Sequence, residues 1–259
     1  VEKLAYLYGP TYYTPKVKMC GISKVETIPA IVEAKPDYMG LVFAPSKRQV
    51  TVDQAKTLVD ELHKQYADRY ATDVAQCNGD TVQDGTVGIK APENVQIGEE
   101  NTNSEAIKTV GVFVNEILDN LVTIAKEANL DAVQLHGDED EAFIQSLKER
   151  TNVEIWKAVQ IRSAADAEAW IDSSADMLLF DAYHKDERGG TGEVFDWSCL
   201  DEFERPFMLA GGIDSTNVAR AIRTVRPYGV DISSGIETDG VKDDEKIKAF
   251  TNIVRTIAH

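Results

Sequence analysis

The amino-acid sequence predicts an α/β fold, a (β/α)₈ TIM barrel that forms a single domain. Short runs of β-branched and apolar residues alternate with amphipathic stretches along the chain, which is typical of βα units on a parallel sheet. Eight such units follow one another without a break. This order favours a closed barrel over an open doubly wound sheet, the alternative that sequence alone leaves open. The 259 residues, 43% of them hydrophobic, suffice for one large core.

The predicted strands are short apolar runs that end at polar or glycine-rich loops. They cover residues 16–20, 37–43, 109–114, 132–136, 155–161, 177–181, 207–210 and 229–233. Helices are predicted to begin near Lys24, Val52, Glu116, Glu139, Ala164, Asp196, Ser215 and Asp243. Side chains suited to helix capping precede six of them, at Ser23, Thr51, Asn115, Asp138, Ser163 and Asp214.

Two segments fall outside this alternation. Residues 1–15 are rich in tyrosine and end in a proline, and they are predicted to be a linker or arm ahead of the barrel domain at 16–259. Residues 68–105 are acidic and rich in Gly, Asn and Thr, which indicates an insertion between the second helix and the third strand. Connections of this kind lie on the barrel face opposite the chemistry, so no catalytic role is expected there, Cys77 included.

Charge and cysteine content exclude several classes of protein. A formal net charge of -17 argues against a nucleic-acid partner, which would need a basic surface, and any anion site must be locally positive. The three cysteines are widely spaced without a CxxC pattern, so they predict neither a disulfide framework nor a zinc site and fit a reducing cytoplasm. No apolar run has the length of a membrane span.

Glycine and serine gather at the ends of the last two predicted strands. The seventh strand runs into Gly211 and Gly212, and the eighth into Ser233, Ser234 and Gly235. Loops at these two positions of a barrel often bind phosphate through their backbone N–H groups. The simpler interpretation is that the glycines only permit tight turns, but their presence at consecutive strand ends favours a phosphate site.

Two charged residues are candidates for the same face of the barrel. Asp181 ends the sixth strand ahead of a glycine-rich loop at 189–192, and a carboxyl at an apolar barrel mouth suits a proton donor. The alternative is an ion pair with Lys185 or Arg188. Arg48 follows the second strand, where its planar guanidinium suits a carboxylated substrate. The alternative is a solvated loop charge.

Period-2 alternation groups the polar residues of three strands. In the fourth strand it sends Gln134 and His136 to one side, and His136 is predicted to orient another group by a hydrogen bond rather than to bind a metal. In the first strand it groups Lys18 with Cys20. The first and eighth strands of a barrel are neighbours, so Lys18 and Asp231 are predicted to form an inward ion pair that favours the Cys20 thiolate. A cysteine that only packs is the alternative.

Taken together, these strand ends resemble one enzyme family. Phosphoribosylanthranilate isomerases of tryptophan biosynthesis are similar to this chain in "KMCGI", "GLVFAPSKRQVT", "VGVFVN", "VQLHGDE", "WKAV", "FD" followed by "GGTGEVFDW", "LAGGI" and "GVDISSGIE". The resemblance runs from about residue 16 to the C-terminus, apart from 68–105. It implies an Amadori rearrangement of N-(5-phosphoribosyl)anthranilate to 1-(2-carboxyphenylamino)-1-deoxyribulose 5-phosphate by general acid–base catalysis, with no metal or organic cofactor.

The resemblance also assigns roles. The family's general base falls on Cys20, its general acid on Asp181 and its contact to the anthranilate carboxylate on Arg48, while the "AGG" and "SSG" loops carry the phosphate-binding backbone. In some bacteria this enzyme is fused to indole-glycerol-phosphate synthase, and the arm at 1–15 resembles a cut from such a chain.

Two alternatives to this function stay open. The isomerase of histidine biosynthesis performs the same rearrangement on a related compound, but it uses two aspartates, the first at the end of strand one, where this chain has Cys20. The second alternative is a non-catalytic phosphate-binding barrel, which would be expected to have lost one of Cys20, Asp181 or Arg48.

Overall fold

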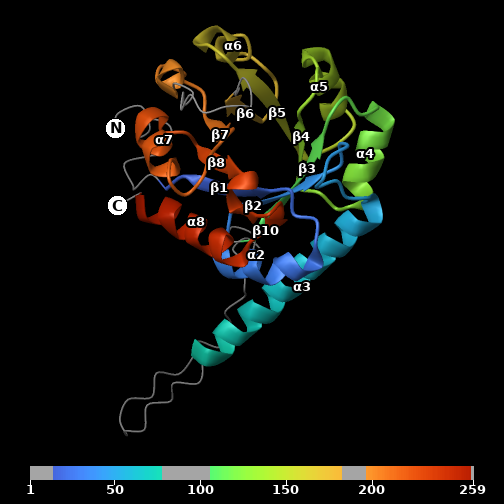
Figure 1. Ribbon diagram of the computed structural model, residues 1–259. Helices are drawn as coiled ribbons and strands as arrows, with labels where there is room; N and C mark the ends of the chain where they lie inside the picture. Colours follow the sequence, from blue (N-terminus) through green and yellow to red (C-terminus); the bar gives the residue numbers. More distant parts are fainter. Residues whose placement is uncertain (1–13, 78–105, 183–196, 258–259) are drawn as a thin grey trace, which may run out of the picture.

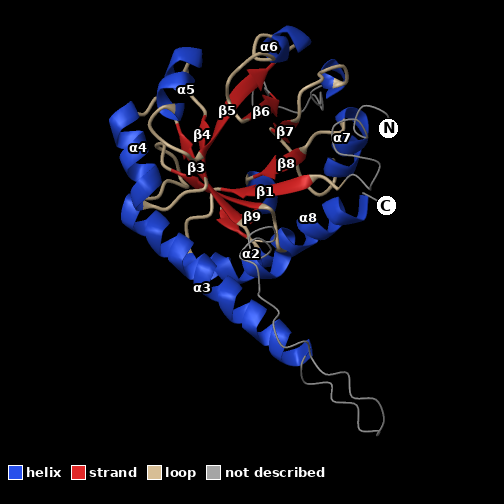
Figure 2. Ribbon diagram, turned by 180° about the vertical axis from the view of Figure 1, so that it is seen from behind, coloured by secondary structure: helices blue, strands red, loops and turns tan. Residues whose placement is uncertain are grey.

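The structure, a computed structural model, describes residues 14–77, 106–182 and 197–257. Eight parallel strands form a closed barrel in chain order, in which the last strand pairs with the first. Figures 1 and 2 show the strands at the centre with the helices arranged around them. The predicted (β/α)₈ barrel is therefore confirmed. Within the described ranges no helix is both long enough and apolar enough to cross a membrane.

The observed strands agree with the predicted ones to within one residue at each end. They are β1 (Lys16–Cys20), β2 (Tyr38–Val42), β3 (Lys108–Phe113), β4 (Ala132–Leu135), β5 (Glu154–Ile161), β6 (Met177–Ala182), β7 (Phe207–Ala210) and β8 (Gly229–Ile232). A further two-stranded hairpin of β9 (Glu237–Thr238) and β10 (Val241–Lys242) follows the barrel strands.

The helices match the prediction less closely. They are α2 (Ile28–Ala34), α3 (Val52–Cys77), α4 (Leu118–Glu127), α5 (Glu141–Lys148), α6 (Ala164–Glu168), α7 (Val218–Val225) and α8 (Asp244–Ile257), with single 3₁₀ turns η1 (Val25–Thr27), η2 (Trp197–Leu200) and η3 (Ser234–Ile236). The first helix thus begins later than predicted, after η1. Near the sixth predicted start only the turn η2 is described, and Asp196 itself lies outside the described residues.

The predicted insertion lies between the second helix and the third strand, and its first residues are helical. Helix α3 continues through residue 77 and extends away from the barrel (Figures 1 and 2), so residues 68–77 of the predicted insertion continue this helix. Residues 78–105, like the arm at 1–13 and the loop at 183–196, lie outside the described residues.

Side-chain hydrogen bonds decide which predicted helix caps are correct. Thr51 and Ser163 accept backbone N–H bonds at the starts of α3 and α6, as predicted. Asp138 does not cap α5, because Asp140 accepts the bond from the Phe143 amide at 2.9 Å instead. Asp138 is held by Asn115, which has a left-handed backbone and likewise does not cap its helix.

The strands separate two hydrophobic clusters because their side chains alternate between the two faces of the sheet. The larger cluster joins the outward-facing strand residues to the helices. The smaller cluster fills the barrel interior and consists of Tyr38, Val110, Ala132, Trp156, Ala158, Leu179, Met208 and Ala210.

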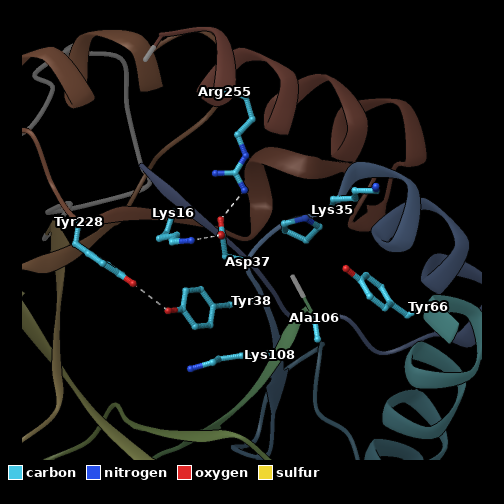
Figure 3. A pocket seen from close by; sticks show the side chains of 10 residues that line it. Lys16, Lys35, Asp37, Tyr38, Tyr66, Ala106, Lys108, Tyr228 and Arg255 are labelled. Atoms are coloured by element: carbon cyan, nitrogen blue, oxygen red, sulfur yellow. Dashed lines mark hydrogen bonds and ion pairs between the residues drawn. The ribbon is translucent and has the colours of Figure 1, made fainter. Parts of the chain in front are cut away.

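An ionic network lines a pocket at the amino-terminal end of the barrel (Figure 3). Asp37 accepts hydrogen bonds from Lys16 Nζ and the Val17 amide at 2.8 Å each and from Arg255 Nη2 at 2.6 Å. Beside this carboxylate, the hydroxyls of Tyr38 and Tyr228 lie 3.4 Å apart. The network joins β1, the start of β2 and the last helix, so it ties the two ends of the described chain together at this face.

Candidate active site

Cys20 is the last residue of β1 and lies at the carboxyl end of the barrel, with 8% of its surface exposed. The next residue, Gly21, has φ +77°, which glycine adopts readily and which turns the chain into the following loop. On the neighbouring strand, a Cβ at Gly40 would lie only 2.9 Å from the Cys20 sulfur. Glycine at this position of β2 therefore leaves the space that the thiol occupies.

The predicted ion pair beneath Cys20 is confirmed. Lys18 is fully buried, and its Nζ lies 2.9 Å from Oδ2 of Asp231 across the β1–β8 pairing. Burial raises the pKa of the Cys20 thiol, whereas the Lys18 ammonium lowers it. The prediction that Lys18 favours the thiolate thus has the right sign, but burial outweighs it. Cys20 is a thiol whose deprotonation depends on the cation below it.

Asp181 and His136 meet at the same end of the barrel. His136 Nε2 lies 3.2 Å from Asp181 Oδ2, and each side chain is about 30% exposed, at 30% and 29%. Gln134, almost fully buried, lies with its Nε2 3.4 Å from Nδ1 of His136. The side chains of Gln134, His136 and Asp181 follow one another at these distances. This arrangement is compatible with the predicted role of His136, which is to orient the Asp181 carboxyl. The alternative partners Lys185 and Arg188, and the glycine-rich loop at 189–192, lie outside the described residues.

A buried ion pair that the sequence did not suggest braces the loop after β4. Lys157 in β5 donates to the carbonyl of Gly137 at 2.7 Å and lies 3.3 Å from Glu139. Glu139 in turn accepts the amides of Asn115 and Gly137 at 2.6 and 2.8 Å. Burial lowers the pKa of Lys157, and the Glu139 carboxylate counters that effect. The pair fixes the backbone directly beyond His136.

The two predicted phosphate loops pack against each other. Gly211 and Gly212 have φ values of +85° and +62°, which permit a sharp turn after β7. A Cβ at Gly235 would collide with the carbonyl oxygen of Ile213, so glycine lets the loop after β8 approach the loop after β7. Ser234 and Gly235 form the turn η3, and Ser233 donates a hydrogen bond to the carbonyl of Cys20 at 3.2 Å. The loops thus adjoin the cysteine.

The Arg48 guanidinium is not a solvated loop charge, because it already binds a carboxylate of this chain. Its Nε and Nη2 donate to the two carboxylate oxygens of Glu237 at 2.6 and 2.7 Å. Lys242 adds a third bond to the same carboxylate at 2.8 Å and another to the carbonyl of Ser233 at 2.8 Å. The hydrogen bonds from Arg48, and after them the bond and charge of Lys242, lower the pKa of Glu237 to about 2. The guanidinium stem lies over Gly21, where an added Cβ would clash with it.

Glu237 and Lys242, like the Lys157–Glu139 pair, were not predicted from the sequence. A signal was present, since "ETDGVK" at 237–242 has the Asp-Gly pair that is common in two-residue hairpin turns. The hairpin formed by β9 and β10 sets Lys242 opposite Glu237. Among the described residues no group of three or more His, Cys, Asp or Glu side chains is arranged to hold a metal ion.

Comparison with known proteins places these features in one family. The family model of N-(5'-phosphoribosyl)anthranilate (PRA) isomerase matches residues 70–253. A PRA isomerase of Thermoanaerobacter sp. (strain X514) is 40% identical over 244 residues, covering 93% of this chain and 98% of the relative. One of Endomicrobium trichonymphae is 37% identical over 246 residues, covering 94% of this chain and 100% of the relative.

Solved structures agree with this assignment. The PRA isomerase of Thermotoga maritima superposes with a TM-score of 0.70 at 30% identity, covering 93% of this chain and 99% of that one. A second PRA isomerase structure, in complex with reduced 1-(o-carboxyphenylamino)-1-deoxyribulose 5-phosphate, gives a TM-score of 0.67 at 28% identity, with 93% and 99% covered. The chain therefore belongs to the N-(5'-phosphoribosyl)anthranilate isomerase family.

Proposed function

We propose that this chain rearranges N-(5-phosphoribosyl)anthranilate to 1-(2-carboxyphenylamino)-1-deoxyribulose 5-phosphate, with Asp181 as the general acid and Cys20 as the general base. The observation that carries this assignment is the pair of groups at the carboxyl ends of β1 and β6. Cys20 lies above the Lys18–Asp231 ion pair, and Asp181 lies beside His136 on another side of the same barrel mouth. An acid and a base separated in this way can act on opposite sides of a ribose.

In the proposed reaction, Asp181 protonates the furanose ring oxygen and the ring opens to an iminium ion. The Cys20 thiolate then removes the proton from C2′, and the resulting enolamine tautomerises to the ketone. The nitrogen of the substrate accepts the electrons during proton removal, so the step draws on no further cofactor. Cys20 acts here as a base toward a carbon-bound proton and forms no covalent bond to the substrate.

The remaining site residues bind substrate in this proposal. The backbone amides around Gly211, Gly212, Ser233, Ser234 and Gly235 take the phosphate, supported by the positive φ values and close packing of the two loops. Arg48 takes the anthranilate carboxylate. His136 contacts the substrate next to the acid, supported by its 3.2 Å approach to Asp181. Gln134, predicted from the sequence to bind substrate as well, is 1% exposed and acts through His136.

An isomerase assay on the wild type and four variants tests the two catalytic roles. Cys20→Ser and Asp181→Asn are each expected to lower kcat by about 10²- to 10⁴-fold, the usual contribution of a general acid or base. Cys199→Ser and Asp119→Asn are matched controls, the first a cysteine of η2 and the second a carboxylate that is 78% exposed. Full activity of Asp181→Asn would exclude this mechanism.

The histidine-pathway alternative is tested by assaying the wild type with both phosphoribosyl substrates. Activity on the anthranilate compound alone is expected, because Cys20 occupies the position at which that other family has an aspartate. The non-catalytic alternative predicts phosphate binding without turnover of either compound. A cytoplasmic location and a fused indole-glycerol-phosphate synthase partner stay predictions.

A further inference from the structure

The contact between Arg48 and Glu237 uses one particular edge of the guanidinium. The two bonds run from Nε and Nη2, the side-on edge. A guanidinium has five N–H donors. Its end-on edge, formed by Nη1 and Nη2, can still donate two hydrogen bonds to a second carboxylate in the same plane. Among the described residues Nη1 has no hydrogen-bond partner. Arg48 is therefore held from one side while its other edge stays open.

Glu237 cannot easily leave this contact. Its side chain is 8% exposed, whereas that of Arg48 is 33% exposed. The β9–β10 hairpin turns through Asp239 and Gly240, both with positive φ, and this turn puts Lys242 directly across from Glu237. The ammonium of Lys242, itself 6% exposed, binds the same carboxylate at 2.8 Å. Because two cations bind its carboxylate and the short hairpin fixes its backbone, Glu237 is a permanent partner of Arg48 in this site.

The charges of this cluster leave one positive charge for a ligand. Arg48 and Lys242 carry two positive charges and Glu237 one negative charge, so the three side chains sum to +1. The chain as a whole has a net charge of -17. The cluster is thus a local cationic site whose exposed member is the guanidinium, and its stem passes over Gly21 next to Cys20.

We infer that Glu237 is a positioning residue for substrate, which holds Arg48 by its side-on edge so that the end-on edge receives the carboxylate of the anthranilate ring. Lys242 balances the charge of Glu237 and connects this clamp to the loop after β8 through the carbonyl of Ser233. The inference rests on the proposed function, because it takes the aryl carboxylate of that substrate as the group that Arg48 binds.

Two inhibitors that differ by one group isolate this role. The first is reduced 1-(o-carboxyphenylamino)-1-deoxyribulose 5-phosphate, and the second is the same compound without the ring carboxylate. The ratio of their dissociation constants, measured by calorimetry, reports only the carboxylate contact, because losses in folding or phosphate binding affect both compounds alike. The proteins are wild type, Glu237→Gln, Lys242→Gln and the control Glu245→Gln, a glutamate that is 89% exposed on α8.

The direction in which Glu237→Gln changes the ratio of dissociation constants distinguishes a positioning role of Glu237 from competition with the ligand for Arg48. Glu237→Gln is expected to cut the preference for the carboxylated compound about tenfold, because Arg48 loses its bidentate anchor. If Glu237 merely competed with the ligand, its neutralisation would raise that preference, and this result would overturn the inference. Lys242→Gln is expected to lower the ratio by a smaller factor, about threefold, and Glu245→Gln to leave it unchanged.

The remaining outcomes are also decisive. Should Glu237→Gln fail to fold, an unchanged ratio in Lys242→Gln would contradict the role of the hairpin. A wild type that catalyses the isomerisation while the ratio is the same in all four proteins would refute only this inference. A wild type that binds neither compound and has no isomerase activity would refute the proposed function as well.

Discussion

At the scale of single residues, the pKa of the Cys20 thiol is set by burial and by the charges around it, of which Lys18 and Lys242 lower it. Burial raises the pKa of its thiol and the Lys18 ammonium lowers it, while the carboxylate of Asp231 raises it again. Because Lys18 lies between Cys20 and Asp231, the same cation stabilises both anions. The thiolate form of Cys20 therefore depends on the Lys18 ammonium, which also neutralises Asp231. Removing the charge of Lys18 should raise the pKa of the thiol, and removing that of Asp231 should lower it.

Alkylation of Cys20 tests this balance. In a Cys77→Ser, Cys199→Ser background at fixed pH, Lys18→Met is expected to slow reaction with iodoacetamide several-fold, because the thiolate fraction falls when the cation is lost. Asp231→Asn is expected to speed the reaction, because a nearby negative charge is removed. The double variant, which leaves no uncompensated charge, serves as the control for folding. Equal rates in the two single variants would contradict the shared-charge account.

Glu237 makes a testable contribution to stability against acid. Its pKa lies near 2 in the folded protein, mainly because of Arg48, whereas its ordinary value is 4.5. A depressed pKa stabilises the fold in full above the ordinary value, and this contribution is lost as the pH falls through the folded value. The difference in unfolding free energy between wild type and Glu237→Gln should thus be largest near neutral pH and shrink between about pH 4.5 and 2. Urea titrations at several pH values measure it, and a constant difference would exclude this linkage.

At the scale of elements, the pairing of β1 with β2 decides where the catalytic thiol lies. Gly40→Ala would bring a methyl group to 2.9 Å from the Cys20 sulfur and 3.0 Å from its Cα, so the strands themselves must shift. We expect kcat to fall at least tenfold, since small displacements of a catalytic group are costly, and stability to fall by about 1–3 kcal/mol from overpacking. Steady-state kinetics together with urea unfolding measure both. Unchanged kcat with reduced stability would mean that Gly40 serves packing alone.

The elements also show what sequence could and could not predict. Strand ends were located within one residue, because apolar runs and period-2 alternation reflect the same pleat that buries them. Alternation likewise predicted the Lys18–Asp231 pair, since neighbouring strands fix which side chains meet. Helix starts were less accurate, because several polar residues near each start compete for the cap, and Asp140 rather than Asp138 accepts the bond at α5.

The missed parts of the site have a common cause. Glu237 and Lys242 approach Arg48 from a hairpin that lies 189 residues away along the chain from it, and Lys157 reaches Glu139 from another strand. Period-2 alternation predicts the Lys18–Asp231 pair because both residues lie on neighbouring barrel strands, but it gives no register for Glu237, Lys242 and Glu139, which lie outside the barrel strands. A single sequence shows which groups can form ion pairs, whereas the partner of each is set by tertiary packing.

At the scale of the whole molecule, the candidate active site and the ionic network around Asp37 lie at opposite ends of the barrel. All the candidate catalytic and binding side chains lie at the carboxyl ends of the strands, whereas the network around Asp37 lies at the opposite end, where it connects β1 and β2 to α8 (Figure 3). Conserving stability at one end and varying chemistry at the other is typical of this fold. Damage at Asp37 should consequently weaken the fold without altering the site.

Replacing Asp37 tests this separation of the two faces. Its carboxylate is 16% exposed and binds two cations and the Val17 amide, so Asp37→Asn leaves Lys16 and Arg255 without their counter-charge. We expect a loss of about 2 kcal/mol in unfolding free energy, between the values for exposed and fully buried pairs, with kcat and KM of the isomerase unchanged. Asp119→Asn, which removes a carboxylate from an exposed ion pair with Arg150, is the matched control and should cost about 0.5 kcal/mol or less. Urea unfolding and steady-state kinetics on the same samples decide the matter, because a fall in kcat at full folding would show that the two ends of the barrel are coupled.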